Sequence, residues 1–116
     1  MEKLTIDRNG ISVTALWGWL GKDLAVILYG GDTPHIGAVS CSAAGGEYGF
    51  VLPAHRDDAV TCLMAEKLRK FVDGTVCVMG GVHIDGITRA QIGEVVAICG
   101  ELAEEVGMLL QHVSNI

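Results

Sequence analysis

Three of the four histidines in this 116-residue chain occur in segments that follow apolar runs. His35 lies in GGDTPHIG (residues 30–37) and His83 in GGVHIDG (80–86), so a glycine pair precedes both. His55 follows a third apolar run and directly precedes Arg56. Imidazole exchanges protons near neutral pH, forms hydrogen bonds and binds metal ions. If the three segments converge in the fold, they predict a polar rim around a small-molecule site.

Two other roles for these histidines stay open, a hydrogen bond within the loop and the binding of a metal ion. Each imidazole could do no more than hydrogen-bond its own loop. Three histidines with Asp32 or Asp85 would also suit a zinc ion that keeps one position for water, which makes a zinc hydrolase an alternative. However, no two histidines are spaced as paired ligands on one element, and no nearby glutamate stands out as a general base. We therefore assign no metal ligand.

Other catalytic signatures are missing from the sequence. It has no Gly-x-Ser-x-Gly elbow, no P-loop lysine and no dinucleotide fingerprint. Arg56 stands at the start of a predicted helix, where free N–H groups favour a phosphate, but Asp57 and Asp58 would oppose an anion unless they point away. From these residues we assign no catalytic residue.

The elements that must position these residues begin with strands. Asn9-Gly10 between two β-branched runs predicts a hairpin of strands 4–8 and 11–20, with Trp17 and Trp19 on the core side of the second. Short turns then lead to strands 24–29, 36–43 and 48–52. Five successive strands on short turns favour a largely antiparallel meander.

Two helices and a sixth strand follow. Residues 56–71 have apolar positions at helical spacing, and residues 75–79 form a short buried strand. Thr88 and Gln91 have the form of a capping box before a long helix. Its apolar stripe is predicted to comprise Ile92, Val95, Val96, Cys99, Leu102, Val106, Leu109 and Leu110. The chain is expected to form one domain over residues 1–116, a two-layer α/β (α+β) fold with a mostly antiparallel sheet of about six strands and two helices.

Composition limits the partners. The net charge is −6 with scattered basic residues, which argues against nucleic acid. No run is apolar enough to cross a membrane, and the start resembles no signal peptide, so a soluble cytoplasmic protein is expected. The four cysteines lie in apolar runs without a Cys-x-x-Cys pair and are predicted to be reduced and buried.

A glycine repeat marks the last helix. Gly93, Gly100 and Gly107 recur every seven residues, although each costs about 0.8–1 kcal/mol relative to alanine inside a helix. Close packing should offset this cost. We favour packing in a homodimer, with contact against the domain's own sheet as the alternative.

Three segments together carry a family resemblance. Residues 30–39, 52–58 and 81–88 resemble, in order and spacing, those of the small prenylated-flavin chaperones, the LpdD-like accessory proteins of gallate decarboxylase systems. The likeness extends from about Asp23 to Leu110. It implies a protein that binds prenylated FMN, or FMN, made available by a flavin prenyltransferase. The protein would assist delivery of this cofactor to a non-oxidative prenylated-FMN-dependent decarboxylase without catalysing decarboxylation.

The resemblance also implies a set of cofactor-binding residues. The histidines and Arg56 would contact the flavin, and the glycines would permit its close approach. The implied set comprises Gly30, Gly31, Asp32, Thr33, Pro34, His35, His55, Arg56, Gly81, His83 and Asp85.

The order of strands and helices is also similar to that of the small proteasome-assembly chaperones. That similarity implies a second function, assembly of protein partners through the helices and a dimer surface. In that case the histidine segments would tolerate mutation, whereas flavin binding would make them sensitive.

Overall fold

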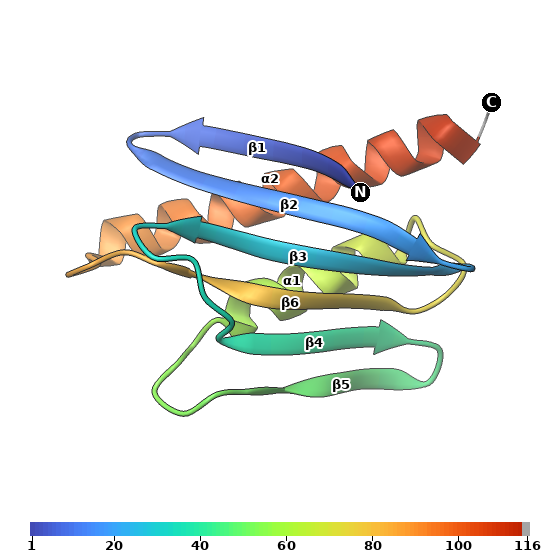
Figure 1. The fold of residues 1–116 in the computed structure, drawn as a ribbon, viewed down its shortest axis with the longest axis horizontal. Helices are drawn as coiled ribbons and strands as arrows, with labels where there is room; N and C mark the ends of the chain where they lie inside the picture. The colour runs from blue at the N-terminus through green and yellow to red at the C-terminus, as the bar shows by residue number, and fades with distance from the viewer. Residues whose placement is uncertain (115–116) are drawn as a thin grey trace.

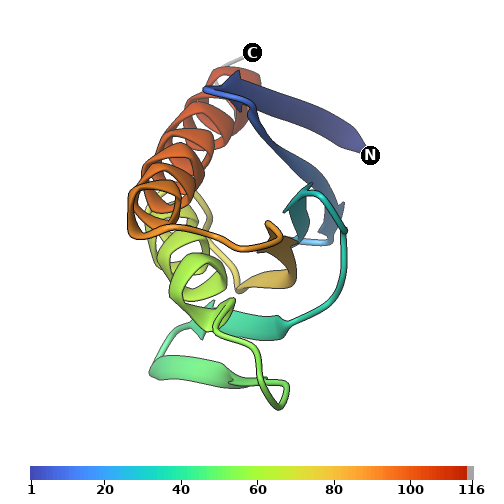
Figure 2. The same ribbon diagram turned by 90° about the vertical axis from the view of Figure 1, so that its left-hand side faces the viewer.

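In the computed structural model, which describes the backbone of residues 1–114 and the side chains of residues 1–111, the chain forms two layers. One layer is a six-stranded sheet and the other consists of two helices packed on one of its faces (Figures 1 and 2). The elements in chain order are β1 (Glu2–Arg8), β2 (Ile11–Leu20), β3 (Asp23–Gly31), β4 (Ala38–Ala43), β5 (Gly46–Val51), α1 (Asp58–Arg69), β6 (Val76–His83) and α2 (Arg89–Ser114). The predicted α+β class, with six mostly antiparallel strands and two helices, is confirmed.

The predicted meander is wrong in its second half. The sheet order is β1-β2-β3-β6-β4-β5, so the last strand in sequence inserts between β3 and β4. β6 runs parallel to β3 and antiparallel to β4. A parallel pair needs a long crossover connection, and here the β4–β5 hairpin and α1 provide it. The nearly continuous apolar run of β6 suits a central strand.

Local signals place the ends of several elements correctly. Asn9 and Gly10 both adopt positive φ, 53° and 78°, as the tight turn between β1 and β2 requires. Before α2, the Thr88 N–H donates to Gln91 Oε1 at 2.9 Å, and the Gln91 N–H donates to Thr88 Oγ1 at 3.1 Å. The predicted capping box is therefore confirmed.

The hydrophobic core lies between the sheet and the helices. Ile11, Val13, Ala15 and Trp17 of β2 are buried as predicted, but Trp19 is half exposed because it lies near the end of the strand. The stripe of α2 needs correction as well. Ile92, Val96 and Leu109 are exposed, whereas the buried hydrophobic residues of α2 are Val95, Ile98, Cys99, Leu102, Ala103, Val106 and Leu110.

Only one of the four cysteines is buried. Cys99 is in the core, Cys41 and Cys77 are intermediate and opposite each other on β4 and β6, and Cys62 is exposed on α1. All four are free thiols, but the prediction of uniform burial is wrong. Apolar neighbours in sequence alternate between the two faces of a strand, and one face of this sheet has no covering layer.

The glycine repeat of α2 does not form a continuous smooth contact surface. A Cβ at Gly107 would lie 2.3 Å from the ring of Phe71, just after α1, and a Cβ at Gly100 would approach Lys67 of α1. A Cβ at Gly93 would meet open space. Gly107 therefore permits close contact between α2 and Phe71, and not the contact with the sheet that was the alternative. Packing of the repeat in a homodimer stays a prediction.

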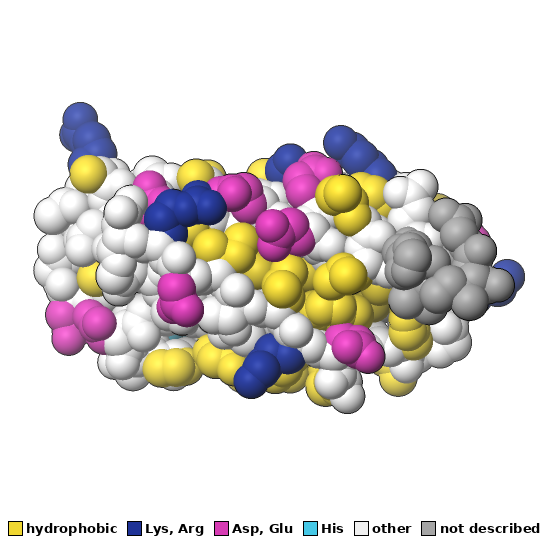
Figure 3. All heavy atoms as spheres, turned by 90° about the horizontal axis from the view of Figure 1, so that it is seen from above, with side chains coloured by type: hydrophobic (Ala, Val, Ile, Leu, Met, Phe, Trp, Pro, Cys, Tyr) yellow, Lys and Arg dark blue, Asp and Glu magenta, His cyan; other side chains and the backbone are white. Residues whose placement is uncertain are grey.

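Charged side chains of both signs are interspersed over β1 and α2 around a hydrophobic strip (Figure 3). Arg8 of β1 pairs with Glu101 of α2 and lies 3.8 Å from Glu94. The hydrogen bond from Arg8 lowers the pKa of Glu101, although desolvation of the carboxylate acts in the opposite direction and raises it. Lys67 of α1 similarly pairs with Glu104 at 3.0 Å. Basic residues here connect neighbouring elements instead of forming a patch for a phosphate backbone.

Among the described residues, no helix combines the length and apolarity needed to cross a membrane.

Candidate functional site

The three histidine segments meet at one end of the sheet. Because β3 and β6 are parallel, both strands end at the same end of the sheet, and the segments that carry His35 and His83 lie side by side (Figure 1). The loop before α1 adds His55 from the other side. The ring centroid of His35 is 4.8 Å from that of His55 and 6.0 Å from that of His83.

These rings line a cavity of about 430 Å³, which we call the histidine hollow. It has a polar rim and an apolar wall that comes largely from α1 and α2. The hollow is lined by His35, Ala54, His55, Arg56, Asp57, Ala59, Val60, Val82, His83, Ile87, Ile92, Val95 and Val96. Ile92 and Val96 are thus exposed because they face this hollow rather than the core. Its size and mixed lining are typical of small-molecule sites.

Asp57 is central to the polar rim. Its Oδ2 lies 3.0 Å from His35 Nε2 and 3.5 Å from His55 Nδ1, and its Oδ1 accepts a hydrogen bond from the Val82 N–H at 3.0 Å. Asp57 holds the N-cap position of α1, yet its side chain makes no capping bond. Such a cap is worth about 1 kcal/mol, so this carboxylate forgoes local helix stabilisation to join the two histidine segments.

Two glycines make room for that carboxylate. A Cβ at Gly37 would lie 1.9 Å from Asp57 Oδ2, and a Cβ at Gly81 would lie 2.7 Å from its Cγ. Gly37 follows His35 by two residues, and Gly81 precedes His83 by two. The space beside Gly81, which the sequence pattern predicted for a ligand, is therefore filled by Asp57.

The glycine pairs themselves lie within strands, not in loops as predicted. Gly30 and Gly31 end β3, and Gly80 and Gly81 belong to β6. A Cβ at Gly31 would lie 2.1 Å from the His83 carbonyl oxygen, and one at Gly80 would lie 1.7 Å from that of Leu28. Both residues have positive φ, 78° and 138°, so they permit close packing of the two parallel strands.

The environment of His35 alters its protonation. Burial alone would lower its pKa, but the Thr33 carbonyl at Nδ1 and the Asp57 carboxylate at Nε2 outweigh burial and raise the pKa. The side chains of His35 and Asp57 are only 20% and 10% exposed, so water screens their interaction poorly. Thr33, a predicted site residue, thus acts through its backbone.

His55 is held by a strained turn. Its N–H bonds the Leu52 carbonyl at 3.1 Å, and the preceding Ala54 has φ of +65°, which is unfavourable for a residue with a Cβ. Strain of this kind persists where the surrounding structure fixes it, and it is common at functional sites.

The remaining predicted residues lie outside the histidine hollow. Gly31, Asp32 and Asp85 line a separate small cavity beside the β1–β2 turn. Asp32 accepts a bond from the Asp85 N–H at 2.9 Å, and Asp85 Oδ1 lies 2.9 Å from His83 Nε2. Asp85 therefore hydrogen-bonds the ring of His83, and Asp32 holds the backbone of Asp85 in place. Gly30, Thr33 and Pro34 line neither cavity.

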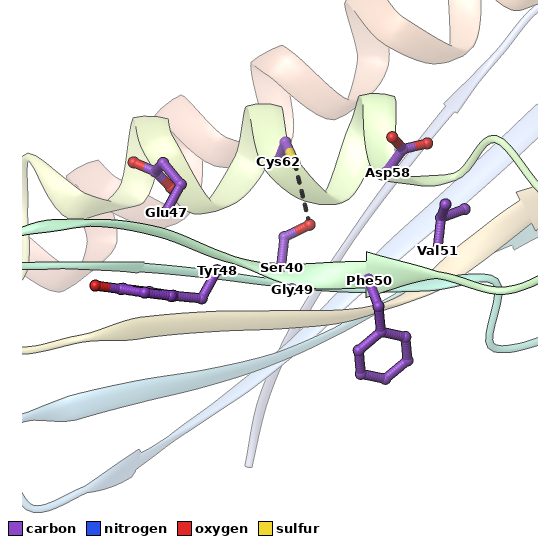
Figure 4. Close-up of a pocket in the computed structure, with 8 residues that line it drawn as sticks. All are labelled: Ser40, Glu47, Tyr48, Gly49, Phe50, Val51, Asp58 and Cys62. Carbon is purple, nitrogen blue, oxygen red and sulfur yellow. Dashed lines mark hydrogen bonds between the residues drawn. The ribbon is translucent and has the colours of Figure 1, made fainter.

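A third cavity of about 290 Å³ lies between β5 and α1 (Figure 4). Glu47 and Asp58 approach it from opposite ends, and the thiol of Cys62 lies 3.2 Å from Ser40 Oγ. No histidine or basic residue is among its lining residues. The charged residues that line this cavity are both acidic, so the cavity is unfavourable for an anionic ligand.

The sequence analysis missed Asp57 and the apolar wall of the hollow. Asp57 was interpreted only as a residue of the first helical turn that would oppose an anion. The available signal was its position two residues after His55, but its approach to His35 depends on how the strands pair. Ile92 and Val96 were assigned to the core because helical periodicity identifies an apolar face without showing what that face contacts.

The chain is thus an α+β domain with a histidine-lined, partly apolar hollow at one end of its sheet. The sequence model of the prenylated flavin chaperone LpdD-like domain matches residues 7–111, and the chain belongs to this family. The predicted family is thereby confirmed. The chain is also 27% identical over 117 residues to Protein LpdD of Lactiplantibacillus plantarum, a match that covers 96% of this chain and 86% of that protein.

Proposed function

We propose that the chain binds prenylated FMN in the histidine hollow and assists its delivery to a non-oxidative prenylated-FMN-dependent decarboxylase in the cytoplasm. A flavin prenyltransferase would supply the cofactor. Family membership supports the class of ligand. The observation that carries the choice of site is the convergence of His35, His55, Arg56 and His83 on one hollow with an apolar wall.

The residues present fit such a cofactor. Val82, Ile92 and Val96 offer an apolar surface for a fused ring system, and imidazoles on the rim can bond its ring nitrogens and carbonyl oxygens. Arg56 is exposed and forms no ion pair within the described part of the chain, so its guanidinium is available for a phosphate. Asp57 points toward the histidines and leaves this cation free.

The same residues favour holding the cofactor over transforming it. Bound prenylated FMN would supply the chemistry of decarboxylation in the recipient enzyme. The polar groups of the hollow bind and orient a ligand, and Asp85 and Asp32 fix the position of His83. We therefore propose an accessory protein rather than an enzyme.

A flavin titration tests this proposal. Native protein and the His35→Ala, His83→Ala and Arg56→Ala variants would be titrated with prenylated FMN, FMN and riboflavin by fluorescence and calorimetry. We expect Arg56→Ala to weaken FMN binding about tenfold or more, because charge-assisted bonds are worth about 1.5–3 kcal/mol. Riboflavin lacks the phosphate, so its affinity should not change in this variant.

Glu47→Gln is the matched control, since Glu47 lines the cavity between β5 and α1. It should bind flavin as the native protein does. A loss in Glu47→Gln with none in the histidine variants would move the site to that cavity. No flavin binding by native protein would contradict the proposal and favour the protein-assembly function.

A further inference from the structure

We propose that His35, His55 and Asp57 form a binding site for one divalent transition-metal ion at the inner side of the histidine hollow. One ring nitrogen of His35, one of His55 and one carboxylate oxygen of Asp57 all lie within 4.8 Å of one another. The sequence argued against a metal because no two ligands share a regular spacing. The tertiary structure brings them together from the β3–β4 and β5–α1 connections.

The distances between the three atoms suit ligands around a common ion. Zinc binds imidazole nitrogen and carboxylate oxygen at about 2.0–2.2 Å, which places neighbouring ligands in a tetrahedron roughly 3.3 Å apart. Asp57 Oδ2 is 3.0 Å from His35 Nε2 and 3.5 Å from His55 Nδ1. The third distance, between the two imidazole nitrogens, is at most 4.8 Å, so the imidazoles must rotate toward each other to admit the ion.

The hydrogen bond between His35 Nδ1 and the Thr33 carbonyl leaves Nε2 of His35 available as a metal ligand. The Thr33 carbonyl, 3.1 Å from Nδ1, can only accept, so Nδ1 carries a hydrogen. In the neutral ring, Nε2 then directs a lone pair at the Asp57 carboxylate. Two acceptors at 3.0 Å repel unless a proton or a cation lies between them. A proton on His35 satisfies this pair alone, whereas a metal ion also satisfies His55, which faces the same oxygen.

The surrounding contacts resemble the outer shell of a metal site. Metal-binding histidines commonly donate their other N–H to a backbone carbonyl, and metal-binding carboxylates are themselves hydrogen-bonded. Here Thr33 holds His35, and the Val82 N–H holds the second oxygen of Asp57. Gly37 and Gly81 admit the carboxylate at the one position from which it faces both imidazoles. The Asp57 side chain makes no capping bond to α1, which leaves its carboxylate available to a metal ion.

The ligand set indicates the kind of ion. Two imidazoles and one carboxylate suit Zn²⁺, Fe²⁺ or Co²⁺, whereas Mg²⁺ and Ca²⁺ prefer oxygen ligands alone. Three protein ligands leave at least one position open, and it faces the hollow, since all three residues line it. His83 bonds Asp85 through Nε2 and is not needed as a ligand.

Metal titration without flavin tests the site independently of the proposed function. Untagged full-length protein, stripped with chelator, would be titrated with Co²⁺ by visible absorption and with Zn²⁺ by calorimetry. We expect one ion per chain and the visible bands of nitrogen and oxygen coordination. Asp57→Asn, His35→Ala and His55→Ala should each weaken binding about 100-fold or more, exceeding the usual effect of an outer-shell change.

Asp58→Asn is the control, because Asp58 is the adjacent carboxylate but is exposed and outside the triad. It should bind metal with native affinity, and circular dichroism would confirm that every variant folds. Failure of stripped native protein to bind Co²⁺ or Zn²⁺ would overturn the proposal, as would an equal loss in Asp58→Asn. Flavin binding in the presence of chelator would leave the proposed function intact in either case.

Discussion

At the scale of single residues, Asp57 shows how tertiary position changes the role of a side chain. An aspartate at a helix start ordinarily caps the helix or complements its dipole. Asp57 instead accepts a bond from β6 and faces two imidazoles from different connections. One residue thereby joins the sheet, α1 and the loop after β3.

Thiol reactivity offers a prediction at the same scale. Burial, together with the Asp57 charge, raises the pKa of Cys99 to about 12, whereas Cys62 is exposed on α1. Because the thiolate is the reactive form, a raised pKa leaves Cys99 protonated at pH 8. We expect iodoacetamide to modify Cys62 at least about 100-fold faster than Cys99 in the native protein, measured by peptide mass spectrometry. Similar rates would contradict the burial of Cys99, and equal rates in denaturant serve as the control.

The paired strand cysteines should also react slowly. Burial, followed by the bond to Cys41, raises the pKa of Cys77 to about 11. The two residues are opposite each other on β4 and β6, on the sheet face without helices. Their labelling should therefore increase as the pH rises toward this pKa, because the thiolate fraction increases.

At the scale of elements, packing gives the three glycines of α2 different roles. The same residue type at the same spacing faces open space at Gly93 and an aromatic ring at Gly107. Helix propensity alone would treat both positions alike.

Alanine substitution should separate these two positions. Gly93→Ala should raise the free energy of unfolding by about 0.5–1 kcal/mol, because alanine restricts the unfolded chain and meets nothing in the fold. Gly107→Ala gains the same propensity, but its Cβ would lie 2.3 Å from the Phe71 ring, and overpacking costs about 1–3 kcal/mol. We expect a net loss of up to about 2 kcal/mol, measured by urea denaturation. Equal gains in both variants would show that Phe71 moves aside without cost.

At the scale of the whole molecule, the sheet has one face without a covering layer (Figure 2). Strand alternation places mainly uncharged residues on this face in β3, β6, β4 and β5, with Asp23 and His83 at the strand ends. We define the open sheet face by Ile27, Tyr29, Val39, Cys41, Tyr48, Phe50, Cys77 and Met79. Phe50, 58% exposed, points away from α1 (Figure 4). An uncharged apolar face of this extent is unusual for a monomer.

We propose that a second copy of the chain covers the open sheet face. The four strands of this face, at about 4.8 Å spacing and each about 20 Å long, present on the order of 400 Å² before side-chain relief, against about 800 Å² per partner in a standard interface. The residues that define the open sheet face carry no charge, which permits pairing of like with like. The surface proposed here differs from the glycine repeat of α2 that the sequence favours for a dimer.

Sedimentation of variants distinguishes the two surfaces. Ile27→Lys places a charge on the open sheet face and should convert a dimer into a monomer, because an unpaired buried charge is costly. Met108→Lys is the matched change on α2, where Met108 is 63% exposed, and should leave the dimer intact. The reverse result would assign the dimer to α2. Native protein that stays monomeric at about 100 μM would contradict the homodimer itself.

Much of the fold is determined by patterns that act over a few residues. The Asn9-Gly10 turn, the Thr88–Gln91 capping box, the two helices and all six strands were predictable, because backbone preferences and side-chain periodicity are local. The resemblance of three segments identified the family, since it rests on residue types in order. From the sequence alone, the convergence of His35, His55 and His83 is a hypothesis.

Tertiary structure alone decided how these local elements combine. The insertion of β6 between β3 and β4 is a long-range pairing, and no local pattern distinguishes it from a simple meander. That insertion places the Val82 N–H within hydrogen-bonding distance of Asp57. Ile92 and Val96, which the sequence assigns to the core, line the histidine hollow instead. The glycine pairs allow β3 and β6 to pack closely. The sequence by itself determined which side chains are available for chemistry. Strand order determined which of them meet, because contacts between distant residues follow from the packing of the whole sheet.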